Sequence, residues 1–129
     1  MLILGSNYEM SLIAILANAG AVLTSLLGLL GLVFPSKAAA FVSISPIGKI
    51  GISEIRATYG GFFLTLGLSA LYTQSPLIFS VVGAAWVSAA IARFASVVID
   101  DSSSSKNFGC IAFEGGIGLL CLTMVRNVV

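Results

Sequence analysis

The stretch Met10–Ser36 reads MSLIAILANAGAVLTSLLGLLGLVFPS and carries no charged side chain. About 20 consecutive apolar residues are enough for a helix to cross the hydrocarbon core of a bilayer, and this run is longer. We therefore predict a membrane-spanning helix over 10–34, ended by Pro35. A cleaved signal peptide is the alternative, since Ala17-Asn18-Ala19 resembles a cleavage site, but no lysine or arginine precedes the run.

The composition of the whole chain is typical of a membrane protein. Of its 129 residues, 58% are hydrophobic and only 9% are charged, whereas about 25% are charged in soluble domains. A soluble chain of this size could not hide so much apolar surface, because small domains leave a large part of their surface exposed. The same figures exclude a disordered chain, a disulfide scaffold and a nucleic-acid-binding module.

Three further apolar runs follow the first. They are separated by a mildly apolar connector over 36–50, a polar turn over 73–75 and a hydrophilic loop over 100–106. The predicted spans are 10–34, 51–72, 76–99 and 107–125. Their hydrophobicity does not alternate with the period of two that is typical of barrel strands. We predict that residues 1–129 form a single all-α domain, an integral membrane bundle of four transmembrane helices with short connectors.

The distribution of basic residues predicts the orientation in the membrane. Lys37 and Lys49 lie in the first connector and Lys106 in the third, whereas Arg126 lies on the opposite side. Cytoplasmic loops carry an excess of lysine and arginine. We therefore expect both long connectors to face the cytoplasm and both termini to lie on the non-cytoplasmic side.

Small residues at regular spacing mark faces where membrane helices can approach closely, because helix association in lipid depends on packing. The predicted helix-packing residues are Gly20, Thr24 and Gly28 in the first span, Gly60 and Gly61 in the second, and Ser80, Ala84, Ser88, Ala92 and Ser96 in the third. We expect the third span to be central, with this face buried against neighbours. The alternative is that such residues are simply common in membrane helices.

Four charged residues lie inside the predicted spans, namely Glu54, Arg56, Arg93 and Glu114. A charge in hydrocarbon costs at least about 2.5–3.5 kcal/mol, so we expect these residues to face protein and to be paired. At 1.5 Å per residue, all four lie roughly 4–11 Å inside the same membrane face. We predict that Arg93 contacts Glu54 or Glu114, while Arg56 takes the other carboxylate or reaches lipid headgroups. Tyr59, one turn from Arg56, is expected to join by a hydrogen bond.

This predicted charge cluster has two interpretations. In the first, it is a structural ion-pair clasp that fixes helix register, for which two acids and two bases balance. In the second, it is a proton or ligand site. Glu54 or Glu114 could ligate the magnesium of a chlorophyll-type pigment while an arginine from another helix balances the charge. The chain has no histidine, the commonest metal ligand, and we predict no site for a metal ion.

The segment Ser53-Glu54-Ile55-Arg56-Ala57-Thr58-Tyr59-Gly60-Gly61 resembles the signature of a bacterial-type family of small four-helix membrane proteins, classed as a domain of unknown function. The resemblance continues through Ala92-Arg93-Phe94-Ala95-Ser96, Asp100 and Glu114, and covers roughly Leu12 to Val125. It implies four membrane helices with a shared charged cluster, and it implies no known activity.

The pattern predicts a non-catalytic protein, because no serine or cysteine is supported by a general base. Small size, little extramembrane mass and abundant close-packing surfaces favour an accessory or assembly subunit of a larger respiratory or photosynthetic membrane complex. Its expected partners are the lipid bilayer and other membrane-protein subunits, with no nucleic acid. The alternatives are a small carrier, or a lipid- or pigment-binding protein, that uses the Glu/Arg cluster.

Overall fold

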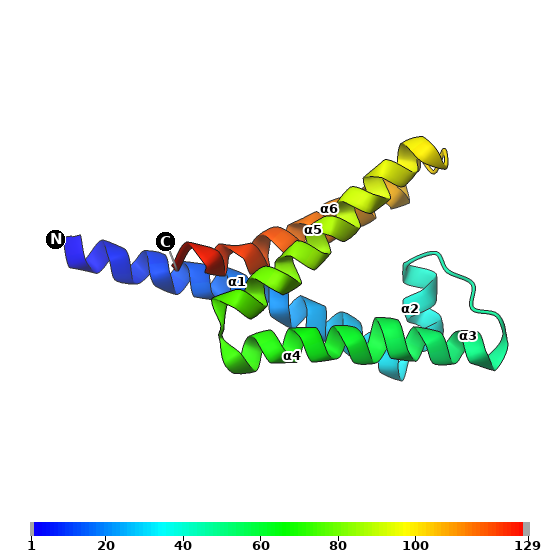
Figure 1. Cartoon of the computed structure of the whole chain (residues 1–129), viewed down its shortest axis with the longest axis horizontal. Helices are drawn as coiled ribbons and strands as arrows, with labels where there is room; N and C mark the ends of the chain where they lie inside the picture. The colour runs from blue at the N-terminus through cyan, green and yellow to red at the C-terminus, as the bar shows by residue number, and fades with distance from the viewer. Residues whose placement is uncertain (1, 128–129) are drawn as a thin grey trace. The chain divides into compact units, whose positions relative to one another are not determined.

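The computed structural model describes residues 2–127, with residues 2–10 and 127 described by their backbone alone. Every regular element in this range is helical (Figure 1). The elements are α1 (Leu2–Val33), α2 (Pro35–Phe41), α3 (Gly48–Ile55), the π-helical segment η1 (Arg56–Phe62), α4 (Phe63–Thr73), α5 (Pro76–Ile99), α6 (Ser105–Leu122) and the 3-10 segment η2 (Thr123–Asn127). The predicted all-α class is therefore confirmed over the described residues.

Three helices are long and apolar enough to cross a membrane. They are Ser11–Val33 within α1, Pro76–Ile99, which is α5, and Ser105–Arg126, which joins α6 to η2. Helix α5 has the bounds predicted for the third span, because proline is well suited to a first helical position, where its missing N–H has no helical partner to lose. Helix α1 begins earlier than the predicted first span. Three helices of this length and composition indicate a multi-pass membrane protein.

The predicted second span is helical throughout but is not one regular α-helix. Helices α3 and α4 are joined by η1, whose hydrogen bonds link residues five apart instead of four. None of these three pieces alone has the length of a transmembrane helix, so the predicted count of four helices is not confirmed. Close packing accompanies the irregular turn. The Tyr59 carbonyl occupies the place of a Cβ on Gly31, and a Cβ on Gly60 would lie 2.9 Å from the Leu32 nitrogen.

The connector between the first two predicted spans contains a short helix. Helix α2 starts with Pro35 at its first position and ends at Phe41. The chain then reverses at Ser43, whose φ of 61° lies in the left-handed region. The Ile44 amide donates a hydrogen bond of 2.8 Å to the Ala39 carbonyl and closes the end of the helix.

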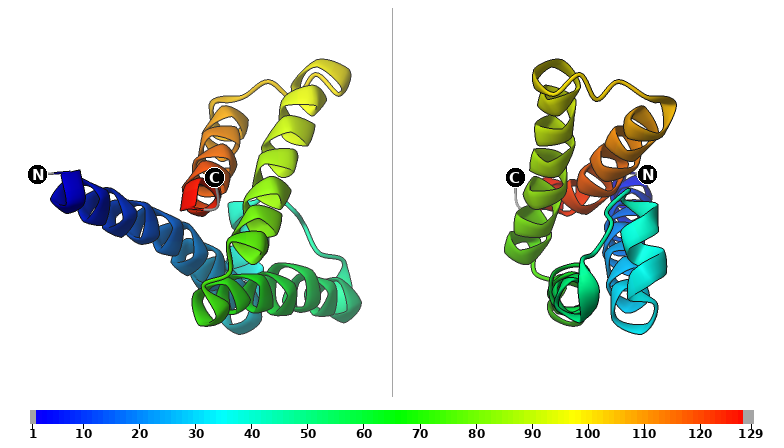
Figure 2. Two further views of the ribbon diagram at one scale, coloured as in Figure 1. Left: turned by 60° about the vertical axis from the view of Figure 1, so that its left-hand side comes forward. Right: turned by 90° about the vertical axis from the view of Figure 1, so that its right-hand side faces the viewer.

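The chain packs as two compact units, unit 1 comprising the residues up to Gly20 and from Gln74 onward, and unit 2 comprising Ala21–Thr73. In unit 1, α5 and α6 lie side by side and antiparallel (Figures 1 and 2). They cross at two glycines: a Cβ on either Gly83 or Gly118 would lie 2.9 Å from the carbonyl oxygen of the other. The absence of both Cβ atoms lets the two backbones meet.

The first part of α1 packs on α6 and on the turn before α5. A Cβ on Gly20 would lie 2.7 Å from the Cys121 Sγ, as expected for a predicted packing residue. Asn18 and Gln74 form a reciprocal amide pair, with Nδ2 to Oε1 at 3.2 Å and Nε2 to Oδ1 at 2.7 Å. Gln74 has a φ of 50°, a left-handed conformation that this pair helps to hold. No sequence pattern predicts this contact.

The face of α5 that is buried differs from the predicted one, and this is a correction. The buried residues of α5 are Phe79, Val82, Gly83, Trp86 and Ala90. In the predicted stripe, the three central members Ala84, Ser88 and Ala92 are exposed, and the end members Ser80 and Ser96 are half-buried. The physical reason is that a helix turns about 100° per residue, so a spacing of four drifts by about 40° at each step. The stripe therefore winds around the outer side of the helix.

Unit 2 pairs the second part of α1 with η1 and α4, and glycines again set the approach. A Cβ on Gly28 would overlap the backbone of Leu64, and a Cβ on Gly67 would overlap Ser25. The earlier residue Ser25 thus lies opposite the later residue Gly67, whereas Gly28 lies opposite Leu64, so the two helices run antiparallel. Gly28 thus packs as predicted. The predicted residue Thr24 is fully buried, with an exposed fraction of 0%.

Gly61 does not pack as predicted. A Cβ at this position would meet nothing closer than 4.0 Å, the distance to the Arg56 carbonyl oxygen. Its neighbour Gly60 is buried and faces Leu32 instead, because the two consecutive residues point to different sides of the helix. Only one glycine of the predicted pair therefore serves as a helix contact.

Candidate functional site

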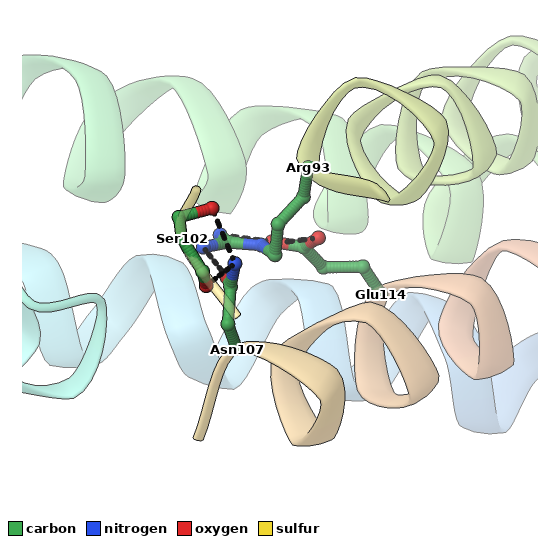
Figure 3. Close-up of polar contacts among 4 residues, drawn as sticks. All are labelled: Arg93, Ser102, Asn107 and Glu114. Carbon is green, nitrogen blue, oxygen red and sulfur yellow. Dashed lines mark hydrogen bonds and ion pairs between the residues drawn. The ribbon is translucent and has the colours of Figure 1, made fainter. Parts of the chain in front are cut away.

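The candidate site is an ion pair between Arg93 of α5 and Glu114 of α6 (Figure 3). The Arg93 Nε donates to Oε2 of Glu114 at 2.9 Å, and Nη2 donates to Oε1 at 2.5 Å. Two parallel bonds between a guanidinium and a carboxylate fix orientation as well as distance. The Glu114 side chain is 11% exposed and that of Arg93 is 27% exposed. The site is thus a largely enclosed, charge-neutral pair.

The hairpin geometry brings these two residues together. Arg93 lies three residues beyond Ala90, so it continues the buried face of α5 by almost one turn. Glu114 lies three residues before Ile117 on the buried face of α6. Because α5 and α6 are antiparallel, the continuation of one face stands opposite the start of the other. The ion pair is therefore an extension of the apolar contact between the two helices.

Asn107 and Ser102 complete the site, and neither is among the residues predicted from the sequence. The Asn107 side chain accepts from Arg93 Nη1 at 3.3 Å and donates to the Ser102 carbonyl at 2.9 Å (Figure 3). The Ser104 hydroxyl accepts from the Asn107 backbone amide at 3.0 Å and caps α6. A serine three residues before a polar helical residue is a recognisable cap signal, and it could have located Asn107 on the first turn.

Glu54 and Arg56 depart from the predicted buried cluster, because both side chains are exposed. They belong to unit 2, where each has its own partner. Glu54 Oε1 accepts a hydrogen bond of 2.8 Å from the Thr58 hydroxyl, one turn along. Arg56 Nη1 donates to the carbonyl oxygen of Leu32. The prediction of four buried charges is therefore corrected: Glu114 is buried and Arg93 is half-buried.

The bond from Arg56 to Leu32 has a clear origin. The last carbonyl groups of an α-helix have no partner within the helix, and the C-terminal end carries a partial negative charge. Leu32 lies in the last turn of α1, which ends at Val33, so Ser36, whose amide would pair with the Leu32 carbonyl in a continuing helix, lies beyond the end of α1. A guanidinium donates a hydrogen bond to such a carbonyl group, and its positive charge offsets the partial negative charge at the end of the helix. Arg56 thus caps α1.

Tyr59 is placed by packing rather than by the hydrogen bond expected from the sequence. Its ring is edge-on to that of Phe63, with centroids 5.7 Å apart. It also packs against a small apolar core formed by Ala38, Ala39 and Ile55. The tyrosine therefore helps to join η1 to α2.

The signature segment noted in the sequence coincides with the irregular part of the fold. Its residues from Arg56 to Gly61 fall within η1. Such π-helical turns are rare and are frequently found at functional sites. The family model for the domain of unknown function DUF4345 matches residues 12–125, almost the whole chain. The chain belongs to this family. No curated protein and no solved structure was found to match it.

The chemistry available to this DUF4345 protein at the Arg93–Glu114 pair is electrostatic. Both carboxylate oxygens of Glu114 accept bonds from one guanidinium. In the part of the chain that the structure describes, there is no group of three or more Cys, Asp or Glu side chains able to hold a metal ion. The arrangement can hold the two helices in register.

Proposed function

We propose that this protein is a non-catalytic, multi-pass membrane protein that acts as an accessory or assembly subunit within a larger respiratory or photosynthetic membrane complex. The observation that carries the proposal is the exposed small-residue face of α5, formed by Ala84, Ser88 and Ala92. In lipid, such a face lets another helix approach closely, and the rest of unit 1 leaves it uncovered. A helix of a partner subunit is the occupant that this face fits.

The proposal includes four membrane spans with both termini on the non-cytoplasmic side. The continuous helical stretch Gly48–Thr73 supports the additional span. At about 1.5 Å per residue it exceeds the roughly 30 Å of a hydrocarbon core, although η1 interrupts its regular pattern. The positions of Lys37, Lys49 and Lys106 support the orientation.

A native gel of gently solubilised membranes tests the proposal. The wild-type protein is expected to migrate with a complex much larger than itself. Replacing Ala84 and Ser88 together by leucine is expected to release it, since bulk on this face blocks a close helix contact. The matched control is Ala112→Leu, a substitution at an exposed alanine of α6, which should leave the complex intact. Migration of the wild type as a small free species overturns the proposal.

A second candidate function is a carrier or ligand-binding role, and the exposed carboxylate of Glu54 favours it. The donor of its bond from Thr58 is an uncharged hydroxyl, and Glu54 forms no ion pair among the described residues. A proton, a lipid headgroup or the magnesium of a pigment could use such a carboxylate. The absorption spectrum of the purified protein and its change in Glu54→Gln test the pigment case. A colourless wild-type preparation excludes it.

A further inference from the structure

The charged residues of unit 2 are gathered in one part of its sequence. Between Ala21 and Thr73, the charged side chains are Lys37, Lys49, Glu54 and Arg56. All four are exposed. The net charge is +2, since three cations stand against one acid. The rest of the unit carries no charge.

The three cations lie on elements that pack together. Helix α2, which carries Lys37, contacts both α3, which carries Lys49, and η1, which begins with Arg56. Ala39 of α2 and Ile55 of α3 belong to the same buried apolar core. The cations are therefore held at one end of unit 2 by folded structure.

Large exposed apolar side chains lie near Lys37 and Lys49 in the sequence. Ile47 and Ile50 flank Lys49 and are 90% and 85% exposed. The Lys37 ammonium lies 4.8 Å from the centroid of the exposed Phe34 ring. Between residues 34 and 50, the exposed large apolar residues are Phe34, Phe41, Ile44, Ile47 and Ile50. Exposed apolar side chains close in sequence to lysines are a combination that a membrane interface accommodates.

We name this region the connector surface: the cations Lys37, Lys49 and Arg56 together with those five apolar residues. The boundary between the headgroups and the hydrocarbon of a bilayer suits both the cations and the exposed apolar side chains of this surface. Isoleucine and phenylalanine side chains can enter the edge of the hydrocarbon layer, while lysine keeps its charged end among the headgroups. A cytoplasmic leaflet rich in anionic lipid attracts nearby basic residues with about 1 kcal/mol each.

We propose that the connector surface binds anionic phospholipid at the membrane boundary, through Lys37 and Lys49 with Arg56 beside them. The lysines contact the headgroup phosphates, and the flanking apolar side chains insert between the acyl chains. Binding weakens as ionic strength rises, because salt screens exposed charges. The inference rests on the membrane location in the proposed function and adds the class of lipid that is recognised.

The test uses the full chain in nanodiscs that hold equal amounts of phosphatidylglycerol and phosphatidylcholine with identical acyl chains. Native mass spectrometry counts the lipids retained by the released protein. We expect phosphatidylglycerol to be retained in preference, and the ratio to fall about fivefold for each lysine replaced in Lys37→Gln and Lys49→Gln. The double replacement by arginine keeps both charges and should restore the wild-type ratio.

Lys106→Gln is the matched control, because Lys106 is an exposed lysine of unit 1. An effect as large as that of Lys37→Gln would overturn the inference. Equal retention of the two lipids by the wild-type protein would also overturn it. Displacement of the bound lipid by millimolar inorganic phosphate would assign the surface to a free anion instead.

The same preparation distinguishes this inference from the proposed function. Resistance of the protein to carbonate extraction from vesicles measures insertion into the bilayer. A protein that is extracted contradicts the membrane location itself. A protein that resists extraction yet shows no preference for phosphatidylglycerol contradicts the lipid inference alone.

Discussion

Gly83 of α5 and Gly118 of α6 face each other so closely that a Cβ on either would lie 2.9 Å from the other's carbonyl oxygen. This contact sets the closest approach within the α5–α6 hairpin. Further along the same interface, Glu114 accepts both bonds from Arg93. The glycine contact thus holds α5 and α6 at a spacing that the Arg93 side chain can bridge to reach Glu114.

Gly83→Ala is expected to destabilise the protein. A Cβ there would meet backbone, which cannot move aside as a flexible side chain can, so we expect a loss of about 1–3 kcal/mol from overpacking. Gly116→Ala is the matched control, since a Cβ at Gly116 meets nothing within 4 Å. It should stabilise α6 by up to about 1 kcal/mol, because alanine favours helix more than glycine does. Unfolding by SDS titration measures both, and equal effects would contradict the close contact.

Arg93→Leu should lower the free energy of unfolding by about 3–5 kcal/mol, because it leaves the Glu114 carboxylate enclosed without a partner. The double variant Arg93→Leu/Glu114→Leu should recover much of that loss if the pair has a purely structural role. Thermal unfolding in detergent compares the two. A double variant that is stable but no longer assembles or binds its ligand would instead make the pair a functional site.

Ser104→Ala should weaken the start of α6 by about 1 kcal/mol, because the hydroxyl caps the Asn107 amide. Since Asn107 also holds Arg93, the loss of the cap should loosen the ion pair as well. Hydrogen exchange of the first-turn amides is the measurement. Ser103→Ala changes the adjacent exposed serine and should have no effect.

Ser43→Gly should stabilise the connector by about 0.5–1 kcal/mol. Ser43 has a φ of 61°, which glycine adopts without the steric penalty of a side chain. Ser45→Gly, at an exposed position outside that conformation, should be neutral or slightly destabilising. Comparison of the two midpoints of thermal unfolding checks this, and equal shifts would contradict it.

The sequence predicted well wherever a single residue marks a boundary or a burial cost. Pro76 marks the start of α5, and the charge-free run identified a helix within α1 that is long and apolar enough to cross a membrane. Arg93 had to find a carboxylate near its own depth, and the structure places it on Glu114. Each of these conclusions depends on a property of the residues themselves: the missing N–H of proline, the length of an apolar run, or the cost of an unpaired charge.

The sequence failed where the outcome depends on helix rotation or on contacts between distant residues. The stripe through Ala84 and Ser88 has the right composition for a packing face, but its spacing drifts away from the buried side. The change to π-helical geometry in η1 has no counterpart in hydrophobic periodicity. The Asn18–Gln74 pair joins residues 56 positions apart, and neither residue carries a charge that demands a partner.

The separation of Arg93 and Glu114 along the chain has a consequence for biosynthesis. The two residues are 21 positions apart, and ribosomes add about 5–20 residues per second. Arg93 is therefore synthesised roughly one to four seconds before the carboxylate that neutralises it. A nascent chain that stalls after α5 would present a lone guanidinium to the insertion machinery. The hairpin, rather than the single helix, is thus the smallest unit in which this part of the chain can deliver Arg93 to a bilayer together with its carboxylate partner.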